Sequence, residues 1–275
     1  MSRFRWGLNL FNKILVSFAL GIGCTYVLFT QPGHTEYSKK VCIIIDDLGN
    51  RMKGTEEILS LPFKVNVAIM PFLPTTKEDA EKAHERGINI LVHMPMEPKH
   101  GRKDWLGPGA ITSDLSDEEI RKRVEAAIDN VPYAVGMNNH MGSKITTNRR
   151  IMSIVLDVCK EHGLFFVDSK TDYKSVVSKL AAEKEMPFIE NEIFLDDNHT
   201  TEHITKQMKL IEKRLELQDT CVTIGHVGSA GLKTAKVIKT MVPQWSGKIE
   251  PISISEMVKL NANPSPEPQG SSKIR

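Results

Sequence analysis

Short apolar runs recur along the chain between residues 41 and 260, and amphipathic stretches separate them. The first run, at residues 41–45, is continuously apolar, which is typical of a strand covered on both faces in a parallel sheet. The pattern therefore predicts a series of short buried strands. The later runs lie at residues 65–69, 88–92, 133–136, 164–167, about 193–195, 221–224 and 249–254.

The stretches between these runs have the spacing and end signals of helices. Ser116 precedes Glu119 by three residues, which is a capping box. Ile151 and Val155 share one face of a later stretch that closes on Gly163. The predicted helices are "TTKEDAEKAHERG", "SDEEIRKRVEAAIDN", "NRRIMSIVLDVCKEHG", "TTEHITKQMKLIEKRLELQ" and "GLKTAKVIKTMV".

Alternating strands and helices predict right-handed βαβ crossovers on a parallel sheet. Seven or eight such units predict an α/β protein built as a closed or nearly closed (β/α) barrel. An open doubly wound sheet is the alternative, but the chain lacks the GxGxxG loop that would favour it.

Composition limits the possible classes of function but does not identify one. The chain has 275 residues, of which 40% are hydrophobic and 25% charged, as in ordinary globular proteins. The net charge of +2, without a dense basic patch, argues against nucleic acid as the main partner. The four cysteines (Cys24, Cys42, Cys159 and Cys221) form no CxxC motif, so buried thiols are expected rather than a disulfide scaffold.

The two ends of the chain differ from its body. Arg3, Arg5 and Lys13 precede an uncharged apolar run at residues 14–29, so residues 1–30 are expected to be a signal peptide or a membrane anchor. We therefore expect an exported protein on the periplasmic side of the cell envelope, either free or held at the inner membrane. Residues 31–40 are interpreted as a linker, residues 41–260 as the barrel, and the proline- and serine-rich residues 261–275 as a disordered tail.

Polar side chains gather where the predicted strands end. Asp46 and Asp47 directly follow the first strand, and two adjacent carboxylates repel unless a cation or a proton relieves them. The carboxyl ends of parallel strands meet at one rim, where such folds build their sites. Carboxylates and imidazoles on one rim predict a divalent metal and hydrolysis. The groups that follow later strands are His93 and Glu97, then Asn138, Asn139 and His140, then Asp168, then Asp196, Asp197 and His199, and finally His226.

A family resemblance rests on six segments, "IIIDDLG", "VNVAIMPFLPTT", "LVHMPMEP", "NNHMGS", "VDSKT" and "IGHVGS". In this order they resemble the divergent polysaccharide deacetylase family, a relative of the NodB-type carbohydrate esterases, over residues 40 to 258. The resemblance implies a distorted (β/α) barrel of seven to eight strands and a divalent metal, with zinc expected. It also implies removal of N-acetyl groups from an envelope polysaccharide or peptidoglycan.

The resemblance also implies roles for individual residues. Asp46 would be the general base and His226 the general acid, while Asp168 would orient or tune a catalytic group. Asp47, His93 and His140 would hold the metal.

Several assignments remain open. The His-x-x-x-His pair of NodB-type enzymes is replaced by His93 and Glu97, so either Glu97 or His140 could complete the metal site. Asn139 is a candidate oxyanion donor, and Trp105 is either a sugar-stacking residue or an exposed loop anchor. Asp196 and Asp197 either line a sugar groove or cap the helix that starts near Thr200, and the cap is favoured.

Two other functions fit the same rim. One is a glycosidase that uses paired carboxylates across a groove. The other is a non-catalytic envelope protein that binds a glycan or a partner protein on a degenerate deacetylase barrel, which the missing second histidine favours.

Overall fold

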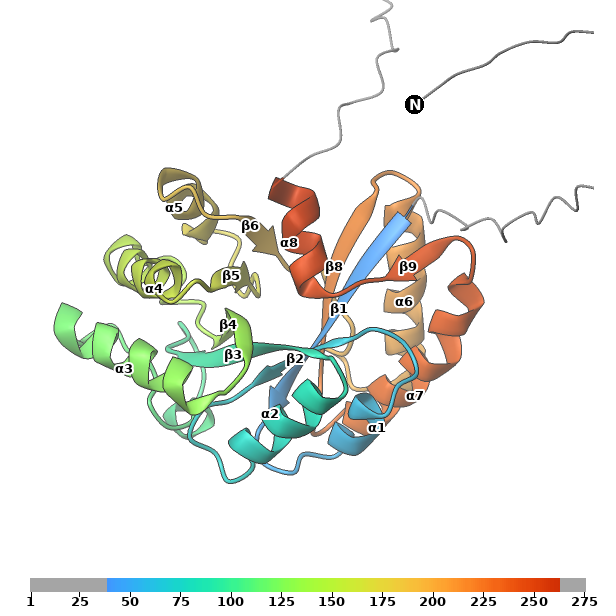
Figure 1. Cartoon of the computed structure of the whole chain (residues 1–275), viewed down its shortest axis with the longest axis horizontal. Coiled ribbons are helices and arrows are strands. Elements are labelled where there is room, and N and C mark those ends of the chain that lie inside the picture. Colours follow the sequence, from blue (N-terminus) through green and yellow to red (C-terminus); the bar gives the residue numbers. More distant parts are fainter. Residues whose placement is uncertain (1–38, 263–275) are drawn as a thin grey trace, which may run out of the picture. The chain divides into compact units, whose positions relative to one another are not determined.

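The computed structural model describes residues 39–262, which form one parallel sheet with helices around it (Figure 1). The strand order is β6-β5-β4-β3-β2-β1-β8-β7, and β9 pairs with the beginning of β1. The strands are β1 (Lys39–Leu48), β2 (Asn66–Ile69), β3 (Asn89–Met96), β4 (Ala134–Met141), β5 (Phe165–Asp168), β6 (Phe188–Glu190), β7 (Ile193–Phe194), β8 (Thr220–His226) and β9 (Ile249–Pro251).

The predicted (β/α) barrel is confirmed, in a distorted form. β6 and β7 stand at the two ends of the strand order, so within the described residues the sheet curls without closing. β6 was not predicted, because three residues next to a proline carry too little pattern. The last predicted run also proves shorter, since a helix already begins at Ile254.

All helices but the last cover the outer face of the curled sheet (Figure 1). Half of the predicted capping box forms, because Ser116 Oγ accepts the N–H of Glu119 at 3.2 Å while the Glu119 carboxylate pairs with Arg123 at 2.7 Å. Within the described residues no helix is long and apolar enough to cross a membrane. The helices are α1 (Thr55–Leu59), α2 (Thr76–Glu85), α3 (Asp117–Asn130), α4 (Arg149–Glu161), α5 (Val177–Glu183), α6 (Thr201–Leu215), α7 (Gly231–Met241) and α8 (Ile254–Ala262), with 3-10 turns at Lys103–Trp105 and Val242–Trp245.

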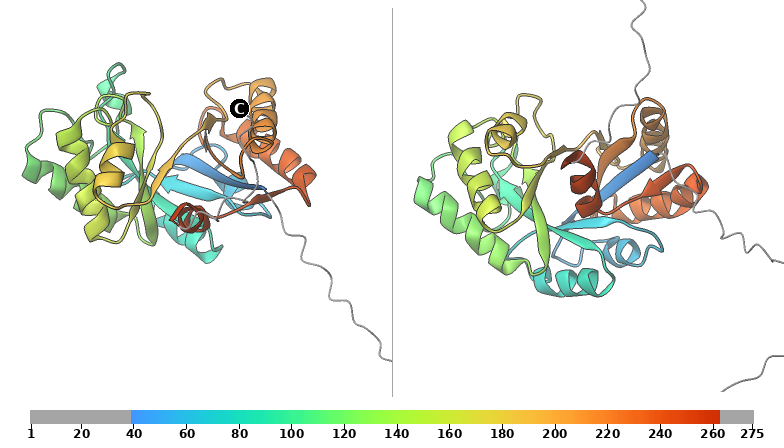
Figure 2. Two further views of the ribbon diagram at one scale, coloured as in Figure 1. Left: turned by 90° about the horizontal axis from the view of Figure 1, so that it is seen from above. Right: turned by 45° about the horizontal axis from the view of Figure 1, so that its top comes forward.

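A second, smaller core fills the inner face of the sheet. Cys42 and Ile44 of β1 pack there with Ile254 and Met257 of α8. The right-hand view of Figure 2 shows α8 between β6 and β1. Asn66 fixes the start of this helix, because its Oδ1 accepts the N–H of Ile254 at 2.7 Å. The inner face is therefore packed, and the space for a site lies elsewhere along the strands.

The cysteine prediction is confirmed for the described residues. Cys42, Cys159 and Cys221 are free and buried. Burial raises the pKa of the Cys159 thiol to about 12, so this sulfur stays protonated at neutral pH. Cys24, like the predicted leader, the greater part of the linker and nearly all of the tail, lies outside the described residues.

β1 contains a bulge at the aspartate pair. Ile45 pairs with Val67 and Leu48 pairs with Ile69, so β1 has one residue more than β2 in this stretch. Asp47 takes up the extra length with a φ of 72°, a left-handed conformation that is uncommon outside glycine. Neighbouring strand residues normally point to opposite faces. The bulge breaks this alternation where the two carboxylates stand.

β4 contains a second bulge near its start. Ile90 pairs with Ala134, whereas Leu91 pairs with Gly136, which leaves Val135 as the extra residue. Beyond the bulge, Asn138 is paired with His93 and faces the same side of the sheet. The bulge thus sets which side chains of β4 point inward, because regular pairing from Ala134 onward would place Met137 opposite His93.

The loop after β1 is held from two sides. On one side, Asp79 of α2 accepts the N–H of Gly49 at 2.8 Å. On the other, the loop crosses the start of α7 so closely that a Cβ on Gly231 would lie 2.0 Å from the carbonyl oxygen of Lys53. Only glycine fits at this crossing, and the contact fixes the backbone that follows Asp47.

Candidate metal centre

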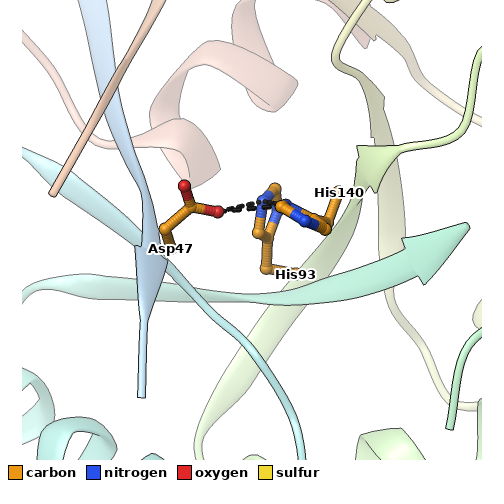
Figure 3. Close-up of side chains that lie close together, drawn as sticks. All are labelled: Asp47, His93 and His140. Atoms are coloured by element: carbon orange, nitrogen blue, oxygen red, sulfur yellow. Dashed lines mark hydrogen bonds and ion pairs between the residues drawn. The ribbon is translucent and has the colours of Figure 1, made fainter. Parts of the chain in front are cut away.

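Three side chains from three strands meet at the carboxyl ends of the sheet (Figure 3). Asp47 Oδ1 lies 3.2 Å from His93 Nε2 and 3.0 Å from His140 Nδ1. The two ring nitrogens are 3.2 Å apart. The sequence placed these residues on one rim, and the structure brings Asp47, His93 and His140 to a common point.

The donor set fits a divalent cation. Ligand atoms about 2.0–2.1 Å from a tetrahedral zinc lie about 3.3 Å from one another, close to the spacings observed here. Asp47 Oδ1 is buried and has no hydrogen-bond partner of good geometry, although two ring nitrogens face it. Two imidazoles and one carboxylate form a set that zinc and related divalent ions accept. A bound cation would satisfy all three atoms at once.

Asn138 connects the metal-binding side to the proposed base. Its Nδ2 donates to both oxygens of Asp46, at 3.0 and 3.2 Å. Its Oδ1 therefore faces His93 and accepts the N–H of Nδ1 at 2.8 Å. This hydrogen bond leaves the lone pair of His93 Nε2 directed toward Asp47 and His140, which is the tautomer that ligation needs.

Asp46 lies beneath the donor cluster and is only 1% exposed. Its Oδ2 is 3.6 Å from His93 Nε2, so the carboxylate borders the point on which the three donor atoms converge. Burial raises the pKa of Asp46, and the charges of His93 and His226 oppose that shift only in part. For Asp47, burial acts in the same direction, but the ring nitrogens of His140 and His93 that face its Oδ1 hold its pKa well below its ordinary value.

His226 stands at the end of β8, and Asp196 holds it. The ring Nδ1 donates to Asp196 Oδ1 at 2.7 Å, and the backbone N–H of His226 donates to Oδ2 at 2.8 Å. Burial alone would lower the pKa of His226, but the hydrogen bond and the charge of Asp196, together with the charges of Asp47 and Asp46, raise it to about 9. The ring is therefore protonated at neutral pH, and its other nitrogen can donate.

A cavity of about 610 Å³ opens above the cluster. Asp47 and His140 belong to its lining, and so do Asp196 and His226. Trp105 adds an aromatic residue to the lining and is 59% exposed. The arrangement combines a cation site, a proton donor and an aromatic surface within one opening.

Glu97 does not join the donor cluster. It forms an ion pair with Lys144 at 2.7 Å and accepts the N–H of Ser113 at 2.7 Å. It therefore anchors the loop after β3, and His140 supplies the third donor atom instead. The alternative that Glu97 replaces the second histidine is thereby corrected.

Asp168 and Asn139 point away from the cavity. Phe166 packs in the outer core, and Asp168 follows it by two residues on the same strand, so it faces the same side. Its Oδ1 accepts the N–H of Lys170 at 2.8 Å, and burial raises its pKa. Asn139 holds the same loop by accepting the N–H of Ser169 at 2.9 Å. The expected roles of Asp168 in catalysis and of Asn139 at an oxyanion therefore lack geometric support.

Two residues of the site were missed or misread in the sequence. Asp196 was expected to cap α6, but Thr200 does so by accepting the N–H of His203 at 3.2 Å. Asp197 pairs with His203 at 2.5 Å, outside the pair that holds His226. Asn138 received no role at all. For both residues, the signal in the sequence was a position at a strand end, next to a residue that the sequence analysis already names as a site candidate.

Comparisons with known proteins agree with this fold. The model of the divergent polysaccharide deacetylase family matches residues 43–258. The uncharacterized protein YibQ of Escherichia coli is 34% identical over 203 residues, which are 74% of this chain and 62% of that protein. An uncharacterized protein of Haemophilus influenzae is 33% identical over 204 residues, 73% of this chain and 72% of that protein.

A solved structure shows the same architecture. The uncharacterized protein ATU2773 of Agrobacterium tumefaciens superposes with a TM-score of 0.76 over 82% of this chain and 92% of that one. At 18% identity this likeness concerns the fold alone. The family model goes further, because its match over residues 43–258 shows that the chain belongs to the divergent polysaccharide deacetylase family.

Proposed function

We propose that the protein is a metal-dependent hydrolase that removes N-acetyl groups from an envelope polysaccharide or peptidoglycan. The observation that carries the proposal is the convergence of Asp47, His93 and His140 at a cavity that His226 also lines. Family membership supports the substrate class, and the donor set supports a divalent cation, with zinc as the proposed ion.

The cation, when bound, would supply Lewis-acid polarisation of the acetyl carbonyl and a lowered pKa for an attacking water. Asp47, His93 and His140 would hold it, and Asn138 keeps His93 in the ligating tautomer. Asp46 would take the proton from the water that adds to the carbonyl.

His226 would complete the reaction on the opposite side. As the C–N bond breaks, its protonated ring would donate a proton to the departing amine of the sugar. Asp196 orients the ring by accepting the N–H of Nδ1, which leaves Nε2 as the donor. The products are acetate and a free amino sugar. Trp105 would hold a sugar ring against the cavity wall.

The proposed place of action is the cell envelope. The basic residues and the apolar run before residue 30 support export, with the leader either cleaved or retained as an anchor.

The test is acetate release from N-acetylated glycans. Purified full-length protein is treated with a chelator, and zinc is then restored. We expect release only from the zinc-loaded protein, and no release from Asp47→Ala. Glu97→Gln, which removes a carboxylate outside the cluster, is the matched control and should stay active. Activity that survives both chelation and Asp47→Ala would exclude the proposed function.

One observation favours a second candidate, a glycan-binding protein without catalysis. Asp46 is 1% exposed and already accepts two hydrogen bonds from Asn138, which limits its access to a water. For this candidate, zinc and glycan would both bind, and no acetate would be released.

A further inference from the structure

His140 uses both of its ring nitrogens. Nδ1 faces Asp47 Oδ1 at 3.0 Å and His93 Nε2 at 3.2 Å, within the donor cluster. Nε2 lies 3.2 Å from the backbone carbonyl oxygen of Trp105. A carbonyl oxygen can only accept, so this contact is a hydrogen bond only when Nε2 carries a proton.

Trp105 lies in a loop whose polar anchors stand at its base, and its neighbour Leu106 is buried. At one end Lys99 donates its backbone N–H to Ser143 Oγ at 2.9 Å, and at the other Arg123 donates to the carbonyl oxygen of Ala110 at 2.6 Å. Between these anchors, residues 101–107 form the tip of the loop, which we call the lid.

The lid has few polar links to the rest of the protein. Its ion pair between Arg102 and Asp104, at 2.6 Å, is internal, and so is the hydrogen bond from Trp105 N to the carbonyl oxygen of Arg102 at 3.2 Å. Apart from these, the contact with His140 is the hydrogen bond that connects the described lid residues to the rest of the protein. The side chain of Lys103 lies outside the described part of the structure. Gly101 and Gly107, with φ values of 139° and 83°, give the backbone freedom at both ends of the lid.

The tautomer of His140 determines whether this contact forms. A cation held at Nδ1 uses the lone pair of that nitrogen and leaves the proton on Nε2, where it binds the Trp105 carbonyl. Without a cation, a neutral ring gains most from an N–H on Nδ1 that donates to the Asp47 carboxylate. Nε2 then presents a lone pair to the carbonyl oxygen, and the two acceptors repel each other.

We propose that residues 101–107 are a metal-dependent lid, closed over the cavity by the hydrogen bond from His140 Nε2 to Trp105 when a cation occupies the donor cluster, and released when it does not. The proposal rests on the metal site of the proposed function. The indole of Trp105 moves with the lid, so a cation would also set the aromatic wall in place for a sugar. By linkage, closing the lid must strengthen cation binding by the same factor.

The test is hydrogen exchange of the full-length protein at one fixed, mildly alkaline pH. Exchange of the backbone amides of residues 101–107 is compared with and without zinc, while calorimetry records zinc binding. The turn at residues 184–187, at the opposite end of the strands, is the internal control. We expect zinc to slow exchange in the lid severalfold and to leave the control turn unchanged.

His140→Asp separates the lid from the metal site. An aspartate oxygen replaces Nδ1 at the same distance along the side chain, but this residue has no N–H for the Trp105 carbonyl. The variant should bind zinc without slowing exchange in the lid. In Trp105→Ala, which keeps the backbone carbonyl, zinc should still slow it.

A second measurement does not depend on a variant. In protein labelled with ¹⁵N-histidine, the His140 ring should carry its proton on Nδ1 without zinc and on Nε2 with zinc. If zinc binds but neither the lid exchange nor the tautomer changes, the lid proposal is wrong and the metal site stands. If zinc does not bind at all, the proposed metal site and the lid proposal both fail.

Discussion

Asp196 accepts two hydrogen bonds from one residue, His226: one from its ring Nδ1 at 2.7 Å and one from its backbone N–H at 2.8 Å. The carboxylate is itself fixed by Thr234 Oγ1, which donates to it at 2.7 Å. The pair resembles the base-and-orienter arrangement that positions an imidazole for proton transfer in many hydrolases.

The pair predicts how activity depends on alkaline pH. With its pKa raised to about 9, His226 is protonated through the neutral range, so a reaction that needs this proton should slow as pH rises through about 9. In Asp196→Asn the charge that raises the pKa is lost, and the alkaline limb of the pH–rate profile should move down toward about 6.5.

Thr234→Val is the control, because it removes a hydrogen bond to Asp196 and keeps the charge. Its alkaline limb should stay close to that of the unchanged protein. An identical alkaline limb in Asp196→Asn would show that His226 is not the proton donor.

The donor cluster predicts the metal content of variants. His93→Ala and His140→Ala each remove one of three converging donor atoms, so zinc affinity should fall by more than the roughly 10–100-fold typical of lost supporting residues. Elemental analysis and calorimetry measure the effect. Glu97→Gln should bind zinc like the unchanged protein, because its carboxylate pairs with Lys144. Loss of zinc in that variant would restore Glu97 as a ligand.

Substitution of Asn138 is predicted to lower both the stability of the protein and its zinc affinity. Asn138→Ala leaves the buried N–H of His93 and the carboxylate of Asp46 without their partner. Unfolding by denaturant should show a loss of about 1–3 kcal/mol, and zinc affinity should fall roughly 10–100-fold.

Asn139→Ala is the matched control for this prediction. It removes a neighbouring amide that points to the outer side and holds Ser169. Stability should fall, while zinc affinity stays unchanged. Equal zinc affinities in both alanine variants would mean that Asn138 does not support His93.

The position of Asp168 predicts that its substitution leaves catalysis unchanged. Because burial raises its pKa, the folded state favours the protonated carboxyl, so its contribution to stability decreases as pH rises above its ordinary value near 3.8. Asp168→Asn keeps an Oδ1 for the N–H of Lys170 and removes this pH-dependent cost. At pH 7 the variant should unfold at the same or a higher denaturant concentration and should release acetate at the same rate. A large loss of activity with unchanged stability would return Asp168 to the catalytic site.

The parts of the fold that follow from burial could be predicted from the sequence. Val41 to Ile45 are fully buried, because β1 is covered by the outer helices and by α8. The continuous apolar run in the sequence of β1 reflects this burial on both faces directly. β6 and β7 have three and two residues, and such short strands form through their neighbours rather than through their own pattern.

The sequence predicts which strand-end residues can form the candidate site, but it does not predict the direction in which each side chain points. Asp47, His93 and His140 were selected because residues at the ends of parallel strands meet. Asp168 met the same criterion and yet faces the outer helices. A sequence shows that a residue ends a strand, whereas the side it faces depends on the count of residues across each strand pair.

The bulge at Val135 shows how much chemistry one irregularity of strand pairing controls. If β4 paired regularly from Ala134 onward, Met137 would stand opposite His93, and Asn138 and His140 would turn to the helices with every amino acid retained. A substitution that removed the bulge and slipped β4 by one residue would thus silence such a barrel while its fold and its sequence signature survived. Relatives that keep all six segments can therefore differ in catalytic competence through the pairing of their strands.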